Sequence, residues 1–127
     1  MKFKKYSKIQ LVIIVILILS MAIQEIISIN QASLTIDERC FIGAGRAVFE
    51  TGNMRNNVFI YHPPLSYYAG SILLLFLKFD KSLWQSNDCW QIGENVTFHS
   101  GHSPNKILFL SMLPFVFLSI ILAFYVL

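Results

Sequence analysis

The chain has 127 residues, of which 55% are hydrophobic and only 13% are charged. A chain of this length can form one small domain, but so few charged residues are untypical of a soluble protein. The composition therefore predicts a membrane protein. The net charge of +3 does not indicate a nucleic-acid partner, because the excess of basic residues lies in the N-terminal tail. The basic residues of this tail are Lys2, Lys4, Lys5 and Lys8.

The first apolar segment, residues 9–29, is long enough to cross a membrane, because about 20 helical residues span the hydrocarbon layer. Residues 1–8 form the basic tail, which the positive-inside rule keeps in the cytoplasm. We therefore expect an integral membrane protein of a cell inner membrane or an ER membrane, with residues 30–106 as an extracytoplasmic loop. Glu25 lies near the outer end of the apolar segment, where we expect its carboxylate to be solvated.

A cleaved signal peptide is the alternative for this first segment. Ser20 and Ala22 are separated by one residue, which is the small-x-small pattern of a cleavage site. The apolar character continues beyond Ala22, and this favours an uncleaved membrane anchor.

An amphipathic helix is predicted near residues 36–51, lying along the membrane surface or beneath a larger assembly. Thr35 and Glu38 have the spacing of a capping box, in which each side chain bonds the backbone amide of the other. Gly52 is typical of the left-handed residue that ends a helix. Small and apolar residues recur between these ends at intervals of three and four, which gives the helix one apolar face. These residues are Phe41, Ala44, Gly45, Val48 and Phe49.

A second loop helix is predicted near residues 64–79. It follows His62 and Pro63, and Pro64 suits the first helical position because proline lacks the amide hydrogen that would be unpaired there. About fifteen mostly apolar residues follow, which is short for an ordinary membrane span. We expect a juxtamembrane helix, and a short tilted span is the alternative.

Residues 107–127 form the second predicted transmembrane helix, which returns toward the cytoplasm and in which Pro114 can introduce a kink. We assign no helix to residues 80–105. His99 and His102 in this segment have a His-x-x-His spacing, but the neighbouring glycine and proline favour a turn. Since no third ligand lies nearby, we predict no metal site there.

The two cysteines, Cys40 and Cys89, are far apart in the sequence and do not have the spacing of a metal site. Free cysteines are commonly buried, and we favour two unpaired buried thiols. The alternative is a disulfide, which an extracytoplasmic compartment permits.

The order of these features resembles the first external loop of the membrane-embedded GT-C glycosyltransferases. The chain begins with an apolar helix, which is followed by the acidic pair Asp37 and Glu38. Next come a helix closed by Thr51 and Gly52 and a His-Pro-Pro-Leu sequence that begins at His62. The likeness is to the group of protein mannosyltransferases and lipid A aminoarabinose transferases. It implies an all-α membrane protein in which two transmembrane helices flank a loop with two juxtamembrane helices. The chain would then be an N-terminal fragment of a larger polytopic fold and inactive by itself.

The resemblance implies an inverting glycosyltransferase that moves a sugar from a polyprenyl phosphate to a hydroxyl group of a protein, lipid A or an envelope glycan. Asp37 matches the catalytic aspartate of the family, as the base or acceptor-orienting group, and Glu38 is its capping or supporting partner. Some members are stimulated by a divalent cation, for which Asp37 is the possible ligand. From the residues alone, Asp37 is also simply a favourable partner of the helix dipole.

Arg46, Arg55 and His62 are the candidates for binding the carrier phosphate. A guanidinium group can bond two phosphate oxygens at once, but each arginine can equally meet lipid headgroups or solvent. His62 beside prolines can also be structural. Relatives often carry an arginine before the Leu-Pro of the last segment, and this chain has Met112 instead, so that contact is not expected. The alternative function is a small two-helix membrane protein with a structural or accessory role.

Overall fold

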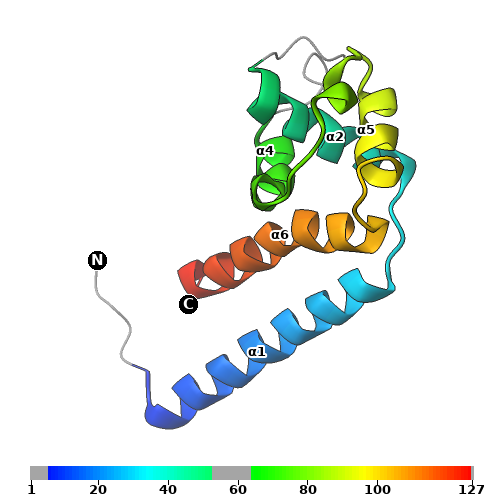
Figure 1. The fold of residues 1–127 in the computed structure, drawn as a ribbon. Coiled ribbons are helices and arrows are strands. Elements are labelled where there is room, and N and C mark those ends of the chain that lie inside the picture. Colours follow the sequence, from blue (N-terminus) through cyan, green and yellow to red (C-terminus); the bar gives the residue numbers. More distant parts are fainter. Residues whose placement is uncertain (1–5, 53–63, 127) are drawn as a thin grey trace.

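The computed structural model describes residues 6–52 and 64–126, and every regular element within these ranges is a helix, as predicted (Figure 1). Two long helices lie side by side at one end of the molecule, and shorter helices form a compact group against one of them. The α-helices are α1 (Lys8–Gln31), α2 (Ile36–Thr51), α4 (Leu65–Ile72), α5 (Cys89–Phe98) and α6 (Pro104–Val126). Two 3₁₀ turns are η1 (Leu73–Phe76) and η2 (Lys81–Trp84). We call α2, α4, η1, η2 and α5 together the helical domain.

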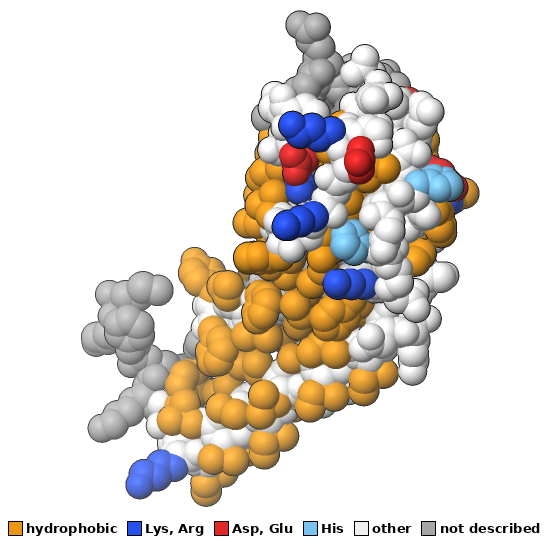
Figure 2. All heavy atoms as spheres, in the orientation of Figure 1, with side chains coloured by type: hydrophobic (Ala, Val, Ile, Leu, Met, Phe, Trp, Pro, Cys, Tyr) orange, Lys and Arg blue, Asp and Glu red, His pale blue; other side chains and the backbone are white. Residues whose placement is uncertain are grey.

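The two long helices, α1 and α6, are each long and apolar enough to cross a membrane. None of the residues of α1 is buried inside the protein. In Figure 2 the hydrophobic side chains cover the two long helices, whereas most charged side chains gather over the helical domain. The two predicted spans agree with α1 and α6 to within three residues at each described end.

Helix α6 packs both on α1 and on the helical domain. It begins at Pro104, three residues before the predicted span, and its first turns bury Ile107, Leu108 and Ser111. From Phe115 onward most of its large apolar side chains are exposed. The observed helix is therefore longer at its start than the predicted span. Its additional first turn and the turn that follows pack on the helical domain and complete the core.

A hydrogen bond joins α1 to α6. The Ser119 hydroxyl donates to Oε2 of Glu25 at 2.8 Å, and both side chains are partly buried. The sequence did not predict this bond, and solvation of the Glu25 carboxylate stays a prediction, since Glu25 lines an open cleft. Its carboxylate finds a donor on the neighbouring helix, which lowers the cost of placing it among apolar residues.

Helix α2 lies at the centre of the helical domain, and the residues from Ile42 to Val48 are all buried. Its close neighbours are α5 on one face and α4 on another. Glycines permit both contacts. A Cβ atom added at Gly43 would lie 2.6 Å from backbone atoms of Gly93, and one added at Gly45 would lie 2.3 Å from the carbonyl oxygen of Tyr67. The backbones therefore approach more closely than any larger residue would allow.

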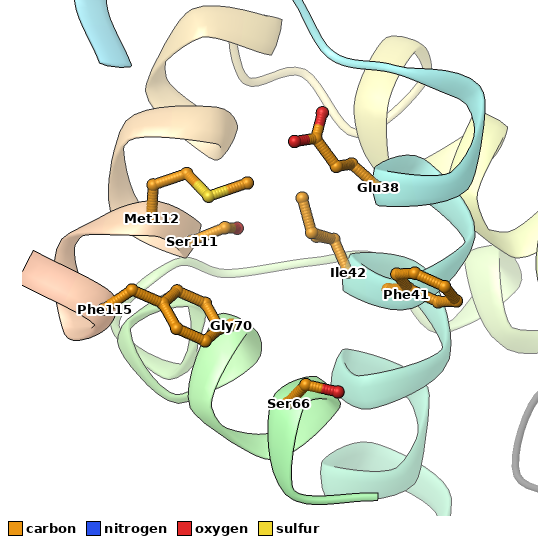
Figure 3. A pocket seen from close by; sticks show the side chains of 8 residues that line it. All are labelled: Glu38, Phe41, Ile42, Ser66, Gly70, Ser111, Met112 and Phe115. Atoms are coloured by element: carbon orange, nitrogen blue, oxygen red, sulfur yellow. The ribbon is translucent and has the colours of Figure 1, made fainter. Parts of the chain in front are cut away.

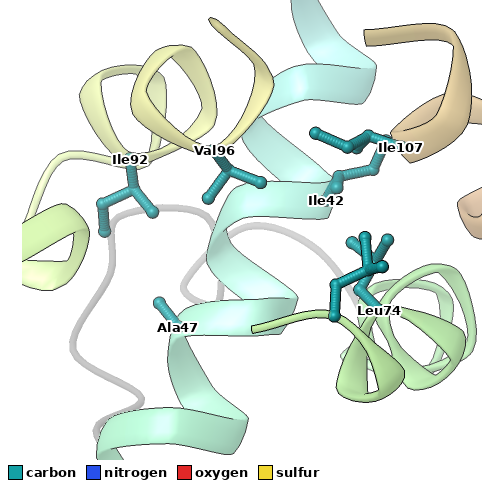
Figure 4. Close-up of a cluster of buried hydrophobic side chains, with 7 residues drawn as sticks. Ile42, Ala47, Leu74, Ile92, Val96 and Ile107 are labelled. Carbon is teal, nitrogen blue, oxygen red and sulfur yellow. The ribbon is translucent and has the colours of Figure 1, made fainter. Parts of the chain in front are cut away.

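The hydrophobic core forms where the helical domain meets the start of α6. Its side chains come from α2, η1, α5, α6 and the chain that follows η1 (Figure 4). The buried members are Ile42, Ala47, Leu74, Leu77, Ile92, Val96 and Ile107. These residues are separated by as many as 65 positions in the chain, so the core holds distant segments together.

The second loop helix is shorter than predicted. Helix α4 ends at Ile72 and η1 ends at Phe76, three residues before the expected end. Leu77 is extended, with φ −98° and ψ 142°. This turn brings Leu77 into the core and places Phe79 against Trp84, so tertiary packing ends the helix before its apolar sequence does.

Helix α5 occupies residues to which the sequence pattern assigned no helix. Asp88 caps it by accepting a hydrogen bond from the amide of Trp90 at 3.3 Å. Its buried face contains Cys89, Ile92 and Val96, which have helical spacing. The omission of this helix is the largest error in the predicted fold, because α5 covers one face of α2.

Cys40 and Cys89 form a disulfide that joins α2 to α5, with Cα atoms 4.8 Å apart. The favoured interpretation as unpaired thiols is therefore wrong. Both residues are almost fully buried, at 1% and 2% exposure, so burial was predicted correctly but not the bond. The close contact of Gly43 with Gly93 brings the two helices near enough for the sulfur atoms to meet.

We predict that Gly43→Ala destabilises the helical domain by about 1–3 kcal/mol, because the new methyl group meets backbone that cannot rotate away. The matched control is Gly70→Ala in α4, where a Cβ would lie no closer than 3.7 Å to the atoms around it. The control should be neutral or slightly stabilising, since alanine favours a helix by about 1 kcal/mol over glycine. Denaturant titration in a mild detergent measures both free energies of unfolding. Equal effects of the two substitutions would contradict the close contact.

We predict that replacing both cysteines by alanine lowers the free energy of unfolding by about 4 kcal/mol, because the crosslink closes a long loop in the unfolded chain. The separation of the two cysteines is 49 residues. The same denaturant titration, carried out with and without a reductant, measures the loss. The reductant should lower the free energy of unfolding of the wild-type chain and leave that of the double-alanine variant unchanged. An equal effect of the reductant on both proteins would show that the disulfide does not stabilise the domain.

Candidate functional site

The candidate site begins at the first turn of α2, which carries the acidic pair. The predicted capping box is confirmed: the Thr35 amide donates to Oε2 of Glu38 at 2.8 Å, and the Glu38 amide donates to the Thr35 hydroxyl oxygen at 3.3 Å. The predicted end of the helix is also confirmed, since Gly52 has φ 66°. The capping box fixes the side chain of Glu38 and leaves Asp37 to point elsewhere.

Asp37 is exposed and makes no hydrogen bond or ion pair with another residue of the described ranges. Its place in the first helical turn puts the carboxylate near the positive end of the helix dipole. The side chain is thus open to a ligand from outside the chain.

Glu38 lies at the edge of a small apolar cavity of about 90 Å³ between α2, α4 and α6 (Figure 3). In Figure 3 the Glu38 carboxylate lies across from Met112, while Ile42 and Phe115 surround the space below them. The cavity is lined by Glu38, Phe41, Ile42, Ser66, Gly70, Ser111, Met112 and Phe115. Met112 supplies part of the apolar wall on the α6 side.

A second, more open cleft of about 290 Å³ lies between α1 and α6. Glu25 and Ser28 line it on α1, and Met112 and Phe115 line it on α6. The same two α6 residues also line the smaller cavity. The apolar cavity and the interhelical cleft are thus neighbours on either side of these two side chains, and each has one glutamate in its lining.

Arg46 is buried, with 3% of its surface exposed. It bonds Glu50 one turn later, and its guanidinium carbon lies 5.2 Å from the ring centre of Phe79 and 5.7 Å from that of Trp84. The sequence predicted that Arg46 binds a phosphate or contacts headgroups and solvent. It did not predict that this side chain is buried inside the domain. The aromatic rings and Glu50 offset part of the cost of removing its charge from water. Its Nε and Nη1 atoms are buried without a hydrogen-bond partner among the described residues.

The predicted site residues are only partly brought together. Arg46 follows Asp37 by nine positions, so it lies about 13 Å further along α2 and faces a different part of the domain. Arg55 and His62 lie outside the described residues. The described geometry therefore places Glu38 of the acidic pair at the apolar cavity. Phosphate binding by Arg46, Arg55 and His62 stays a prediction.

The predicted turn around His99 and His102 is confirmed, because no regular element covers residues 99–103. Nε2 of His102 lies 3.0 Å from the Lys78 carbonyl oxygen, and its ring packs against Phe79 at 5.3 Å between centres. His102 thus ties the start of α6 to the chain after η1. Within the described ranges no three His, Cys, Asp or Glu residues form a metal-binding group.

One ion pair that the sequence reading missed joins Arg39 to Glu94 of α5 at 2.8 Å. The Arg39 guanidinium also lies over the Phe98 ring, at 5.5 Å from its centre. Recognition of α5 would have revealed the ion pair, since Arg39 and Glu94 belong to adjoining faces of two packed helices.

Tyr67 of α4 is buried, and its burial raises the pKa of the phenol. Its ring packs against that of Phe41, with 4.9 Å between the ring centres.

Comparisons of the chain with protein-family models, with curated proteins and with solved structures give no match.

We predict that Arg46→Ala destabilises the helical domain by about 2–4 kcal/mol, because it removes a buried side chain and leaves a void beside the packed rings of Phe79 and Trp84. The matched control is Arg39→Ala, which also removes an ion-paired arginine of α2 that lies over a ring. Because the Arg39 side chain is 23% exposed and its partner is 51% exposed, this loss should be below about 1 kcal/mol. Free energies of unfolding measure the contrast, and a larger loss at Arg39 would show that burial is not what matters.

Proposed function

We propose that the chain is the N-terminal part of a membrane-embedded inverting glycosyltransferase that takes its sugar from a polyprenyl phosphate and passes it to a hydroxyl acceptor. The acceptor is a protein, lipid A or an envelope glycan. The order of sequence features that resembles the GT-C enzymes suggests this function. The observation that carries it is the exposed Asp37 carboxylate, which adjoins Glu38 in the sequence, while Glu38 itself lines an apolar cavity against α6.

This arrangement suits a reaction between a lipid-linked donor and a polar acceptor. Asp37 accepts the proton of the acceptor hydroxyl while that oxygen bonds the anomeric carbon, and the bond to the carrier phosphate breaks on the opposite side. General-base assistance of this kind typically contributes 10²–10⁴ in rate. Glu38 has a supporting role, since its carboxylate is already held by the Thr35 amide.

The leaving phosphate requires positive charge or hydrogen-bond donors. Arg55 and His62 stay the proposed ligands, whereas Arg46 is already paired with Glu50 and buried against the rings of Phe79 and Trp84. A divalent cation would supply charge neutralisation at the leaving phosphate. The described residues offer it only Asp37 and Glu38, of which Glu38 is engaged in the capping box, so they do not form a metal site by themselves.

We further propose that α1 and α6 cross the membrane and that the helical domain lies on its extracytoplasmic side. The length and apolar character of the two helices support the first point. The lysine-rich tail before α1 supports a cytoplasmic N-terminus. The Cys40–Cys89 disulfide supports the second point, because disulfides persist in oxidising compartments and are rare in the cytosol.

A structural or accessory role is the second candidate function. It is favoured by the uncovered apolar surface of α1, which has no buried residue and can pack against another membrane protein. The two functions differ in what Asp37 does. As a helix-end residue it contributes a few tenths of a kcal/mol to about 1 kcal/mol of stability, whereas as a base it decides the reaction rate.

The test uses the longest continuous reading frame that contains these residues, reconstituted in lipid vesicles with a polyprenyl-phosphate sugar. We predict that Asp37→Asn reduces transfer by about 10² or more, because the amide cannot accept the proton. Glu38→Gln should retain most of the activity, since the amide oxygen still accepts the hydrogen bond of Thr35. Asp80→Asn is the matched control, because Asp80 is an exposed carboxylate that caps η2.

Each variant is compared at equal membrane abundance and with its disulfide intact. Loss of transfer in Asp37→Asn alone supports the proposed base. Full activity in Asp37→Asn removes Asp37 from the chemistry, and absence of transfer in every protein, the wild type included, favours the accessory role.

A further inference from the structure

An exposed apolar patch occupies the end of α4 and η1. Ile72 is 48% exposed, Leu75 is 45% exposed and Phe76 is 82% exposed. These three residues lie within five consecutive positions, on a segment whose other face packs on α2 and α6. A phenylalanine that is mostly exposed next to two further exposed aliphatic side chains is typical of a surface that contacts another apolar phase.

The Glu25–Ser119 hydrogen bond gives the level of this patch relative to the two long helices. The helices run in opposite directions (Figure 1), and α1 ends six residues after Glu25, about 9 Å beyond the bond. Gly70 of α4 lies against Ser111 and Phe115 of α6. These two residues lie about 12 Å and 6 Å beyond Ser119 in the same direction, so this part of α4 is level with the end of α1.

The segment continues outward from that level. Leu74 of η1 shares the core with Ile107, which lies about 18 Å beyond Ser119 along α6. The segment from Gly70 to Phe76 therefore lies near the level at which α1 ends, beside the first half of α6. Since the interfacial layer lies just outside the hydrocarbon, this is the depth at which an amphipathic segment rests on a membrane.

Two lysines lie above the patch. Lys78 follows it by two residues, and its carbonyl oxygen is bound to His102, which precedes α6. Lys106 is in the first turn of α6, about 20 Å beyond Ser119. Both are exposed, and neither forms an ion pair with another residue of the described part of the chain. Figure 2 shows basic side chains beside hydrophobic surface where the helical domain meets the long helices.

We propose that this patch docks on the outer leaflet of the membrane: Ile72, Leu75 and Phe76 enter the boundary of the acyl chains, and Lys78 and Lys106 bind phosphate groups of anionic phospholipids. In the direction away from the proposed hydrocarbon layer, the apolar side chains come first and the ammonium groups follow. A phospholipid has the same order, with its acyl chains first and its phosphate beyond them. The proposal rests on the placement of α1 and α6 across the membrane and is independent of sugar transfer.

The first experiment measures depth. The full chain is reconstituted in vesicles, and tryptophan is introduced at one of three positions, Leu17→Trp in α1, Phe76→Trp in η1 or Phe98→Trp in α5, with the wild-type signal subtracted. Lipids brominated on the acyl chain near the headgroup should quench the first two, and acrylamide in the water should quench only the third. Phe98 is the matched control, because it is a half-exposed aromatic that precedes the start of α6.

The second experiment measures lipid preference with Phe76→Trp as the reporter. Brominated phosphatidylglycerol should quench it more effectively than brominated phosphatidylcholine, with a preference of roughly fivefold for each lysine near the surface. Lys78→Gln together with Lys106→Gln should remove the preference. Lys8→Gln, at the opposite end of α1, should leave it unchanged, and high salt should weaken it.

The outcomes separate the inference from the membrane placement on which it rests. If Leu17→Trp is quenched by bromolipid and Phe76→Trp is not, α1 is in the bilayer but the patch is not docked. Protection of Phe76→Trp from both quenchers would show that a protein surface covers it, which also overturns the proposal. A lipid preference that survives both lysine substitutions overturns the assignment of the phosphate contacts. An intact disulfide on a non-reducing gel confirms that each variant is folded.

Discussion

The fold depends on the close approach of α2 and α5 at Gly43 and Gly93. At this contact the two backbones come so near that a single methyl group would collide, and the Cys40–Cys89 bond holds the same pair of helices together. With α5 fixed in this position, Ile92 and Val96 reach the core that η1 and the start of α6 complete. A helical domain too small to have an extensive core thus gains its stability from close backbone packing and a covalent link.

Much of the fold follows from local sequence signals. The capping box at Thr35, the left-handed Gly52 and the two long apolar helices are all decided by nearby residues, and the structure contains each of them. Helix α5 shows where such reading fails. The sequence does contain a signal for this helix: Asp88 can cap it, and Cys89, Ile92 and Val96 follow at helical spacing. The signal is weak because the helix is short and its surroundings are polar. The early end of the α4–η1 segment was not readable, because Leu77 leaves the helix to join residues distant in the chain.

The candidate site could be predicted only as residue types. The sequence indicates that Asp37 and Glu38 open a helix, and the capping box explains why they act differently: one carboxylate is bound by the backbone and the other is free. The cavity beside them could not be foreseen, since its walls come from three helices separated by many residues. The environment of Arg46 could not be predicted from the sequence either, because Phe79 and Trp84 reach this residue only after the chain turns at Leu77.

Helix α6 is one continuous rod that joins two environments. Its N-terminal turns complete the hydrophobic core, and a later turn binds α1 through Ser119. Met112 and Phe115, between these regions, form a common wall of the apolar cavity and the interhelical cleft. A rotation of α6 about its own axis would move Met112 and Phe115 against α2 and against α1 at the same time. The two spaces, each with a glutamate in its lining, therefore cannot change shape independently of each other.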